Sequence, residues 1–120
     1  MRISGKGHVE PKFAREGGRA FYGLFGRPEA ADQDISFVLQ VNQPGSGTED
    51  DNHDLEQWFF VHKGCCRFYV DGEAVVAGPG DLVYVPRNAM HHHEVVGDEA
   101  AELVVIDHWP HDSENELGWE

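Results

Sequence analysis

Two histidines, an amide and a carboxylate in the middle of the chain have the types and spacing of a metal site. Asp51, His53 and Gln57 are an even number of residues apart, and so are His91 and His93. Because side chains alternate between the two faces of a strand, each set shares a face if its segment is extended. Iron, manganese, nickel, zinc and copper all accept imidazole nitrogens and side-chain oxygens. The residues predict one divalent metal ion, held by Asp51, His53, Gln57 and His91, without identifying the element.

Short strands must position these residues. Residues 35–41 carry apolar side chains at the odd positions, with Ser36 and Gln40 between them, which predicts a half-buried strand. Asp71-Gly72 suits a two-residue type I′ turn between strands over 65–70 and 73–77. Further strands are expected over 19–25, 82–85, 91–96 and 103–108. Such short, regularly spaced strands, without a helical apolar period, predict an all-β antiparallel barrel or jelly roll.

The first histidine segment resembles the first signature motif of the cupin superfamily. That motif reads Gly, five residues, His, one residue, His, three or four residues, Glu, six residues, Gly. The chain supplies Gly45, Asp51, His53, Gln57 and Gly64 at these spacings. Asp51 stands where the first His is expected, and Gln57 stands where Glu is expected.

The second histidine segment resembles the second cupin motif. That motif reads Gly, five residues, Pro, one residue, Gly, two residues, His, three residues, Asn. The chain supplies Gly80, Pro86, Asn88, His91 and Val95, with Asn88 in place of Gly and Val95 in place of Asn. The resemblance implies a cupin-type antiparallel β-barrel, also called a double-stranded β-helix or jelly roll.

The resemblance also implies that His53 and His91 are metal ligands, whereas Gln57 is a neutral oxygen donor in place of a carboxylate. Asp51 could supply the missing anion. Two imidazoles and one carboxylate are the ligands of non-haem iron oxygenases. Alternatively, Asp51 belongs to the solvated acidic run 49–51, and the metal site is weak or lost.

Apolar side chains near the motifs could form a substrate pocket. Phe59, Val61, Tyr84 and Trp109 would favour a flat, partly apolar substrate, although core packing explains them equally well. His93 has the parity to face the cavity as a proton-transfer group, or else it fills the barrel mouth.

Three polar side chains are candidates for roles in substrate chemistry. Tyr84 is a second candidate for moving protons. Arg67 and Arg87 could each bind a substrate carboxylate through two hydrogen bonds, and Arg87 could equally be a surface residue.

Composition narrows the classes of function. The 120 residues are enough for one domain, and the net charge of −13 disfavours both nucleic acid and an anionic membrane as partners. No apolar run approaches the roughly 20 residues that span a bilayer, and the N-terminus lacks a signal-like segment, so a cytoplasmic protein is expected. The adjacent Cys65 and Cys66 are expected to be reduced packing residues.

Three segments are expected along the chain. Residues 1–18 form an N-terminal arm, residues 19–110 the barrel, and residues 111–120 an acidic C-terminal tail. A barrel this small leaves apolar sheet surface to cover, which predicts a homodimer.

These features favour a mononuclear-metal cupin that acts as an enzyme, either a dioxygenase or an isomerase or lyase. Its substrate would be a small, aromatic or carboxylate-bearing metabolite. Residues 56–60, followed by Gly64, are also similar to a segment of the 3-hydroxyanthranilate dioxygenase group. The alternative is a non-catalytic cupin that binds a small molecule or a metal.

Overall fold

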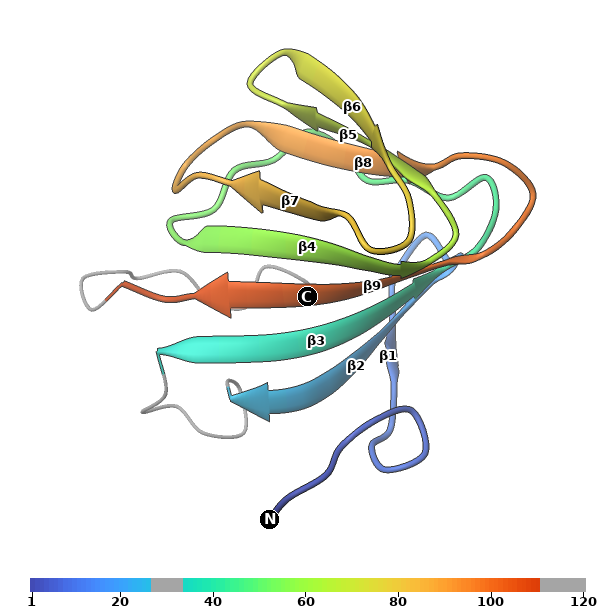
Figure 1. The fold of residues 1–120 in the computed structure, drawn as a ribbon, viewed down its shortest axis with the longest axis vertical. Helices are drawn as coiled ribbons and strands as arrows, with labels where there is room; N and C mark the ends of the chain where they lie inside the picture. Colours follow the sequence, from blue (N-terminus) through green and yellow to red (C-terminus); the bar gives the residue numbers. More distant parts are fainter. Residues whose placement is uncertain (27–33, 111–120) are drawn as a thin grey trace.

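Nine β-strands make up the regular structure of this chain, for which a computed structural model describes residues 1–26 and 34–110 (Figure 1). The strands are β1 (Lys12–Phe13), β2 (Arg19–Gly26), β3 (Ile35–Asn42), β4 (Glu56–Lys63), β5 (Cys66–Val70), β6 (Glu73–Ala77), β7 (Leu82–Val85), β8 (His91–Val95) and β9 (Ala101–His108). The described ranges contain no helix, so the prediction of an all-β chain is confirmed.

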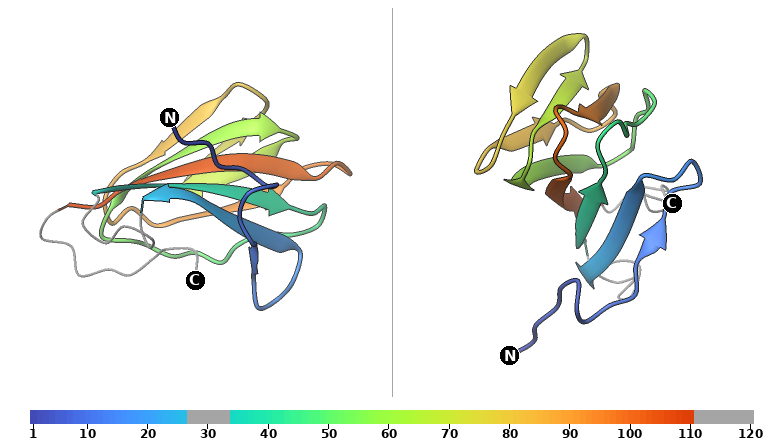
Figure 2. Two further views of the ribbon diagram at one scale, coloured as in Figure 1. Left: turned by 90° about the horizontal axis from the view of Figure 1, so that it is seen from below. Right: turned by 90° about the vertical axis from the view of Figure 1, so that its right-hand side faces the viewer.

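The strands form two antiparallel sheets that enclose the core. The larger sheet has the order β1-β2-β3-β9-β4-β7, and the smaller has the order β6-β5-β8 (Figures 1 and 2). Phe59 of β4 and Phe68 of β5 meet across the interior, with ring centroids 5.3 Å apart. The core is drawn from alternate residues of both sheets. This is the predicted jelly roll.

Tight turns occur where the motif residues require them. Asp71 and Gly72 both have positive φ, 48° and 84°, as the predicted type I′ turn demands. Asn88 has a φ of 65°, which asparagine tolerates, so it can replace the motif glycine. Gly64 has a φ of 76°, and a Cβ there would lie 2.6 Å from the carbonyl oxygen of Ala100. This close approach explains the glycine at the end of the first motif.

The interior face of β3 is the opposite of the one that its apolar pattern suggests. Ser36, Val38, Gln40 and Asn42 are buried in the interior, whereas most of the apolar residues at odd positions are only half-buried. The reason is register: β3 pairs with β9 so that Ser36 lies opposite Asp107, and these polar residues share the inner face. The interior is therefore polar at this level of the barrel.

The N-terminal segment folds against its own chain. Lys12 and Phe13 pair with Phe21 and Ala20 of β2. The turn that follows brings residues 13–16 to the edge of the cavity described below. The predicted acidic tail, 111–120, lies outside the described residues.

The structure also bears on membrane insertion by helices. Across residues 1–26 and 34–110, no helix is long and apolar enough to cross a bilayer.

Candidate functional site

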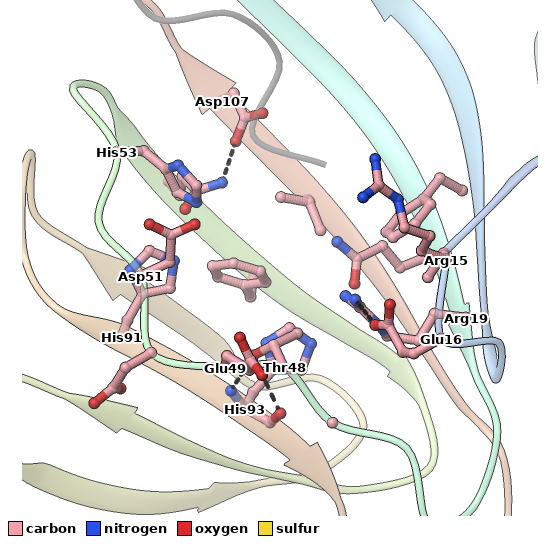
Figure 3. A pocket seen from close by; sticks show the side chains of 18 of the residues that line it. Arg15, Glu16, Arg19, Thr48, Glu49, Asp51, His53, His91, His93 and Asp107 are labelled. Carbon is pink, nitrogen blue, oxygen red and sulfur yellow. Dashed lines mark hydrogen bonds and ion pairs between the residues drawn. The ribbon is translucent and has the colours of Figure 1, made fainter. Parts of the chain in front are cut away.

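A cavity of about 730 Å³ opens between the two sheets. Side chains from β2, β3, β4, β8 and β9 line it, together with the segments 13–16 and 47–53. Figure 3 shows that it has two chemically different ends. Asp51, His53, His91 and Asp107 gather at one, called here the imidazole end. Arginine side chains lie at the other, called here the guanidinium end.

At the imidazole end, two histidine rings lie edge to face. The centroids of His53 and His91 are 5.2 Å apart, with an interplanar angle of 64°. His91 Nδ1 lies 3.0 Å from the carbonyl oxygen of Ala89, which fixes the ring and leaves Nε2 for a ligand. Burial, and then the neighbouring His91, lower the pKa of His53. Both effects favour the neutral imidazole that a metal requires.

The loop before β4 holds the ligand candidates in place. β4 begins only at Glu56, so Asp51 and His53 are not on a continuous strand, and this part of the expectation was wrong. The loop instead bonds irregularly to the edge of β8. The amide and carbonyl of Asp51 exchange hydrogen bonds with those of His91, at 3.0 and 2.8 Å. Asp51 is therefore placed beside His91 by backbone bonds rather than by strand parity.

Gln57 offers an oxygen at the same end. Its Nε2 donates to Asp107 Oδ1 at 2.8 Å, whereas its Oε1 is buried and finds no hydrogen-bond partner among the described residues. Leaving such an atom unsatisfied costs about 1–3 kcal/mol. Asp107 thus fixes the orientation of the amide and leaves the oxygen as an acceptor for a bound group.

Asp107 is a cavity residue that the sequence analysis did not identify. It lies opposite both Ser36 and Gln57 in the sheet and is fully buried. Burial raises the pKa of its carboxyl to about 6, against the lowering effect of the hydrogen bonds from Gln57 and Ser36. A signal was present: Asp107 follows Leu103 and Val105 at strand spacing, so a carboxyl falls on the apolar face of β9.

The guanidinium end contains two arginine side chains. Arg15 and Arg19 line the cavity, and Arg19 pairs with Glu16 (Figure 3). His93 and Gln40 are buried and line the cavity as well. Burial, followed by the charge of Arg19, lowers the pKa of His93 to about 3. His93 is therefore a neutral imidazole near a cation, and it lines the cavity.

Phe59 lies between the two ends. Its ring centroid is 6.3 Å from that of His91 and 5.5 Å from that of His93. The ring is 2 % exposed, so it forms an apolar wall that links two polar regions. The predicted role of Phe59 in lining the pocket agrees with this position.

The other residues predicted to bind or transform a substrate do not line this cavity. Tyr84 and Arg87 border a separate hollow of about 320 Å³, where Tyr84 bonds Glu56 and Arg87 pairs with Asp54. Tyr84 is on strand β7, where alternation turns its side chain outward, and Arg87 follows the strand after Pro86. Because neither residue lines the cavity, the proton-transfer role of Tyr84 and the carboxylate-binding role of Arg87 have no support there.

Three further candidates occupy structural positions. Arg67 lies beside Glu94, with their charged atoms 3.3 Å apart and both side chains about half exposed. Val61 is fully buried in the core, below the cavity lining. Trp109 is buried, and its Nε1 lies 3.4 Å from Ser36 Oγ. These contacts explain the residues without a ligand.

The residues at the imidazole end fit a metal by chemistry. His53 and His91 supply neutral imidazole, and Gln57 supplies an oxygen without a partner in the described part of the chain. Within residues 1–26 and 34–110, no three His, Cys, Asp or Glu side chains are close enough together to hold an ion. This finding does not cover the amide oxygen of glutamine. A three-ligand metal site with His53 and His91 therefore depends on Gln57 as the third ligand.

Comparison with known proteins identifies the family. The model of the cupin domain matches residues 38–107, which is more than half of the 120 residues. The chain belongs to the cupin family. No curated protein matches its sequence.

Solved cupin structures share the fold at low sequence identity. A predicted oxalate decarboxylase from Thermotoga maritima superposes with a TM-score of 0.82 and 17% identity, covering 91% of this chain and 100% of the other. KdgF from a Halomonas species gives 0.76 and 16%, covering 93% and 97%. The polyketide cyclase RemF from Streptomyces resistomycificus gives 0.77 and 18%, covering 99% and 89%. At these identities the likeness shows the fold alone.

Proposed function

We propose that this cupin is a metal-dependent enzyme that acts on a small, carboxylate-bearing metabolite. His53, His91 and Gln57 would hold one divalent ion, and Asp51, beside His91, would balance part of its charge without binding it. The observation that carries the proposal is the buried Oε1 of Gln57, which lacks a partner among the described residues and lines the same cavity as the two imidazoles. Such an ion would act as a Lewis acid on a substrate oxygen.

Each residue at the imidazole end has a defined part in this proposal. Asp107 holds the amide of Gln57 so that nitrogen, and not oxygen, is used within the protein. The carbonyl of Ala89 orients His91 in the same way. Supporting hydrogen bonds of this kind set ligand orientation in metal sites. Asp51 is exposed, and its backbone bonds to His91 keep its carboxylate close to the rings.

The reaction class is narrowed by the chemistry of the cavity and by the similar structures. The cavity volume lies within the range of about 300–1,000 Å³ that small-molecule sites occupy. Two similar structures are named as a decarboxylase and a cyclase, which favours a lyase or isomerase over a dioxygenase. Phe59 keeps the path between the two ends apolar and accommodates a carbon skeleton, aliphatic or aromatic.

A second candidate is a cupin that binds its ligand without transforming it. The two departures from the motif, Asp51 and Gln57, favour this alternative, because a neutral amide holds a hard cation more weakly than a carboxylate does. The cavity would then serve as a binding site only.

One experiment separates the two candidates. Metal-free protein is loaded separately with iron, manganese, nickel, zinc or copper and incubated with a panel of small hydroxy and aromatic acids. Proton NMR follows the acids, and an electrode follows dioxygen. We expect one acid to be consumed only when the metal is present and without uptake of dioxygen. Dioxygen uptake would instead indicate a dioxygenase. Saturable binding of an acid without turnover by any metal form would support the binding protein.

A further inference from the structure

Three buried polar atoms around the guanidinium end have no hydrogen-bond partner in the described ranges. They are Arg19 Nε, Gln40 Oε1 and His93 Nε2. All three residues line the one cavity and come from three different strands, β2, β3 and β8. Buried polar groups in folded proteins are normally paired with protein, water or a ligand. Three such atoms in one cavity, two from the large sheet and one from the small sheet, therefore indicate a prepared binding site.

Arg19 is held so that part of its guanidinium stays available. Its side chain is only 15% exposed, and one terminal nitrogen contacts the carboxylate of Glu16, which is itself 55% exposed. The guanidinium carbon lies 5.4 Å from the ring centroid of Phe21, its neighbour on the same face of β2. Because arginine has five N–H donors in a planar fork, these contacts leave Nε for a second acceptor. A carboxylate is the acceptor that best matches this fork.

The cationic side chains of the cavity lie at this end. The chain has only nine Lys and Arg residues against 22 Asp and Glu, yet Arg15 and Arg19 both line this cavity. Lys6 and Arg67 lie outside the cavity beside Glu102 and Glu94, and the carboxylates that line the cavity with the two arginines are Glu16, Glu49, Asp50, Asp51 and Asp107. An anion would meet the cationic part of the cavity at Arg19.

We propose that Arg19, Gln40 and His93 form a carboxylate subsite that binds one end of a hydroxy acid. Arg19 Nε donates to the carboxylate, and the Gln40 oxygen accepts from a hydroxyl group of the same molecule. His93 Nε2 supplies a third hydrogen bond from β8. This subsite lies apart from the proposed metal ligands, with Phe59 between them, and extends the proposed function by naming the substrate class and its orientation.

The subsite can be tested without a metal. Protein freed of metal on a chelating resin is titrated by calorimetry with D-gluconate and with salicylate. Each acid has a matched alcohol, D-glucitol and salicyl alcohol, which lacks only the carboxylate. We expect at least one acid to bind about tenfold or more tightly than its alcohol. Equal affinities for both pairs, or tighter binding of inorganic phosphate than of either acid, would overturn the subsite.

Variants then assign the binding to Arg19. Arg19→Gln should reduce acid affinity about tenfold and leave alcohol affinity unchanged, whereas Arg67→Gln, which removes the same charge outside the cavity, should have no effect. Glu16→Gln should strengthen acid binding several-fold, because it removes the competing carboxylate. A gain of this kind cannot arise from misfolding. Unchanged acid affinity in both Arg19→Gln and Glu16→Gln would contradict the assignment.

This inference rests on the proposed function, but the two can fail separately. Metal content is measured on the same wild-type sample before the resin treatment. Acid binding with no metal found would retain the carboxylate subsite and reject the metal enzyme. Bound metal with no preference for acids over alcohols would do the reverse.

Discussion

The two ends of the cavity differ in how far they depend on a loop. At the imidazole end, Asp51 and His53 lie on a loop that is pinned to the edge of β8 by irregular bridges. At the guanidinium end, Arg19 and Gln40 lie within the regular ladder of β2 and β3. Side chains on a loop depend on a few hydrogen bonds, whereas those on paired strands are fixed by register. The two ends can therefore be altered independently.

The two ends also differ in the charge of the groups that they bury. The imidazole end buries groups that can be neutral, since burial lowers the pKa of His53 and raises that of Asp107. The guanidinium end instead keeps a permanent cation and balances it with the exposed Glu16. Neutral donors suit a metal ion, and a half-compensated cation suits an anion.

The largest expected effect is the loss of metal from the imidazole end alone. His53→Ala removes a proposed ligand and should weaken metal binding by more than the roughly 10–100-fold that loss of a supporting partner costs. The preference for acids over alcohols should stay the same, because Arg19 is untouched. Competition with a chromophoric chelator and calorimetry measure the two quantities. Loss of both together would show that the ends are not independent.

The next effect concerns pH and the neutral His93. Its pKa is about 3 in the folded protein against 6.5 for an unperturbed histidine, so the unfolded chain binds the proton more tightly between these two pH values. Its contribution to stability is complete above pH 6.5 and is lost as the pH falls towards 3. Between pH 6.5 and 4.5 the loss is about 2–3 kcal/mol.

The measurement for this effect is the difference in unfolding free energy between His93→Gln and wild type. Asp107 has the opposite sign, because its raised pKa makes the folded state bind a proton more tightly below pH 6. Taking the difference between variants cancels this contribution. Chemical denaturation of metal-free protein should show the variant gaining on wild type as the pH falls. A difference that is constant with pH would refute the neutral, buried imidazole.

A similar or smaller effect is expected when the hydrogen bond that orients Gln57 is removed. Asp107→Leu removes the acceptor for Gln57 Nε2 and frees the amide to turn, so metal affinity should fall about 10–100-fold. Asp107→Asn keeps an acceptor and should restore most of that affinity. Equal metal affinity in the leucine variant and in wild type would exclude an orienting role for Asp107.

The smallest effect on metal and acid binding is expected from substitutions on the outer face of the large sheet. Phe60 and Leu82 are cross-strand neighbours there, 37% and 57% exposed. We propose that a second copy of the chain covers this face, because exposed apolar side chains on a sheet are a typical site of association between proteins. Phe60→Ser with Leu82→Ser should convert a dimer to a monomer in light scattering. Metal and acid affinities should stay within about twofold, since the altered side chains point away from the cavity. A wild-type monomer would contradict the proposed association.

The fold was predictable because its signals are local. Alternation, the Asp71-Gly72 turn and the glycine and proline spacings each depend on a few neighbouring residues, and the all-β jelly roll followed from them. The pairing of His53 and His91 in one place was predictable from the motif spacing, and their rings are 5.2 Å apart.

The rest of the site depends on register between distant strands, which the sequence does not reveal. Alternation in β9 puts Asp107 on the apolar face, but its place beside Ser36 and Gln57 arises because β9 lies between β3 and β4, an order that no local pattern specifies. Gln40 was placed on the solvent side of β3 because the apolar residues alternate with it, yet pairing turned it inward. Arg67 and Arg87 were the candidates for binding a carboxylate, but among the arginines in residues 1–26 and 34–110 only Arg15 and Arg19 line the cavity.

The central claim is that His53, Gln57 and His91 hold a divalent metal at the imidazole end. Elemental analysis of purified wild type, His91→Ala and His92→Ala tests it most directly. His92 is the matched control, since it is adjacent in sequence but stacks on Tyr69, with centroids 4.2 Å apart, outside the cavity. We expect about one ion per chain in wild type and His92→Ala, and a sharp loss in His91→Ala. Equal metal content in all three proteins, or none in wild type after incubation with each ion, would contradict the claim.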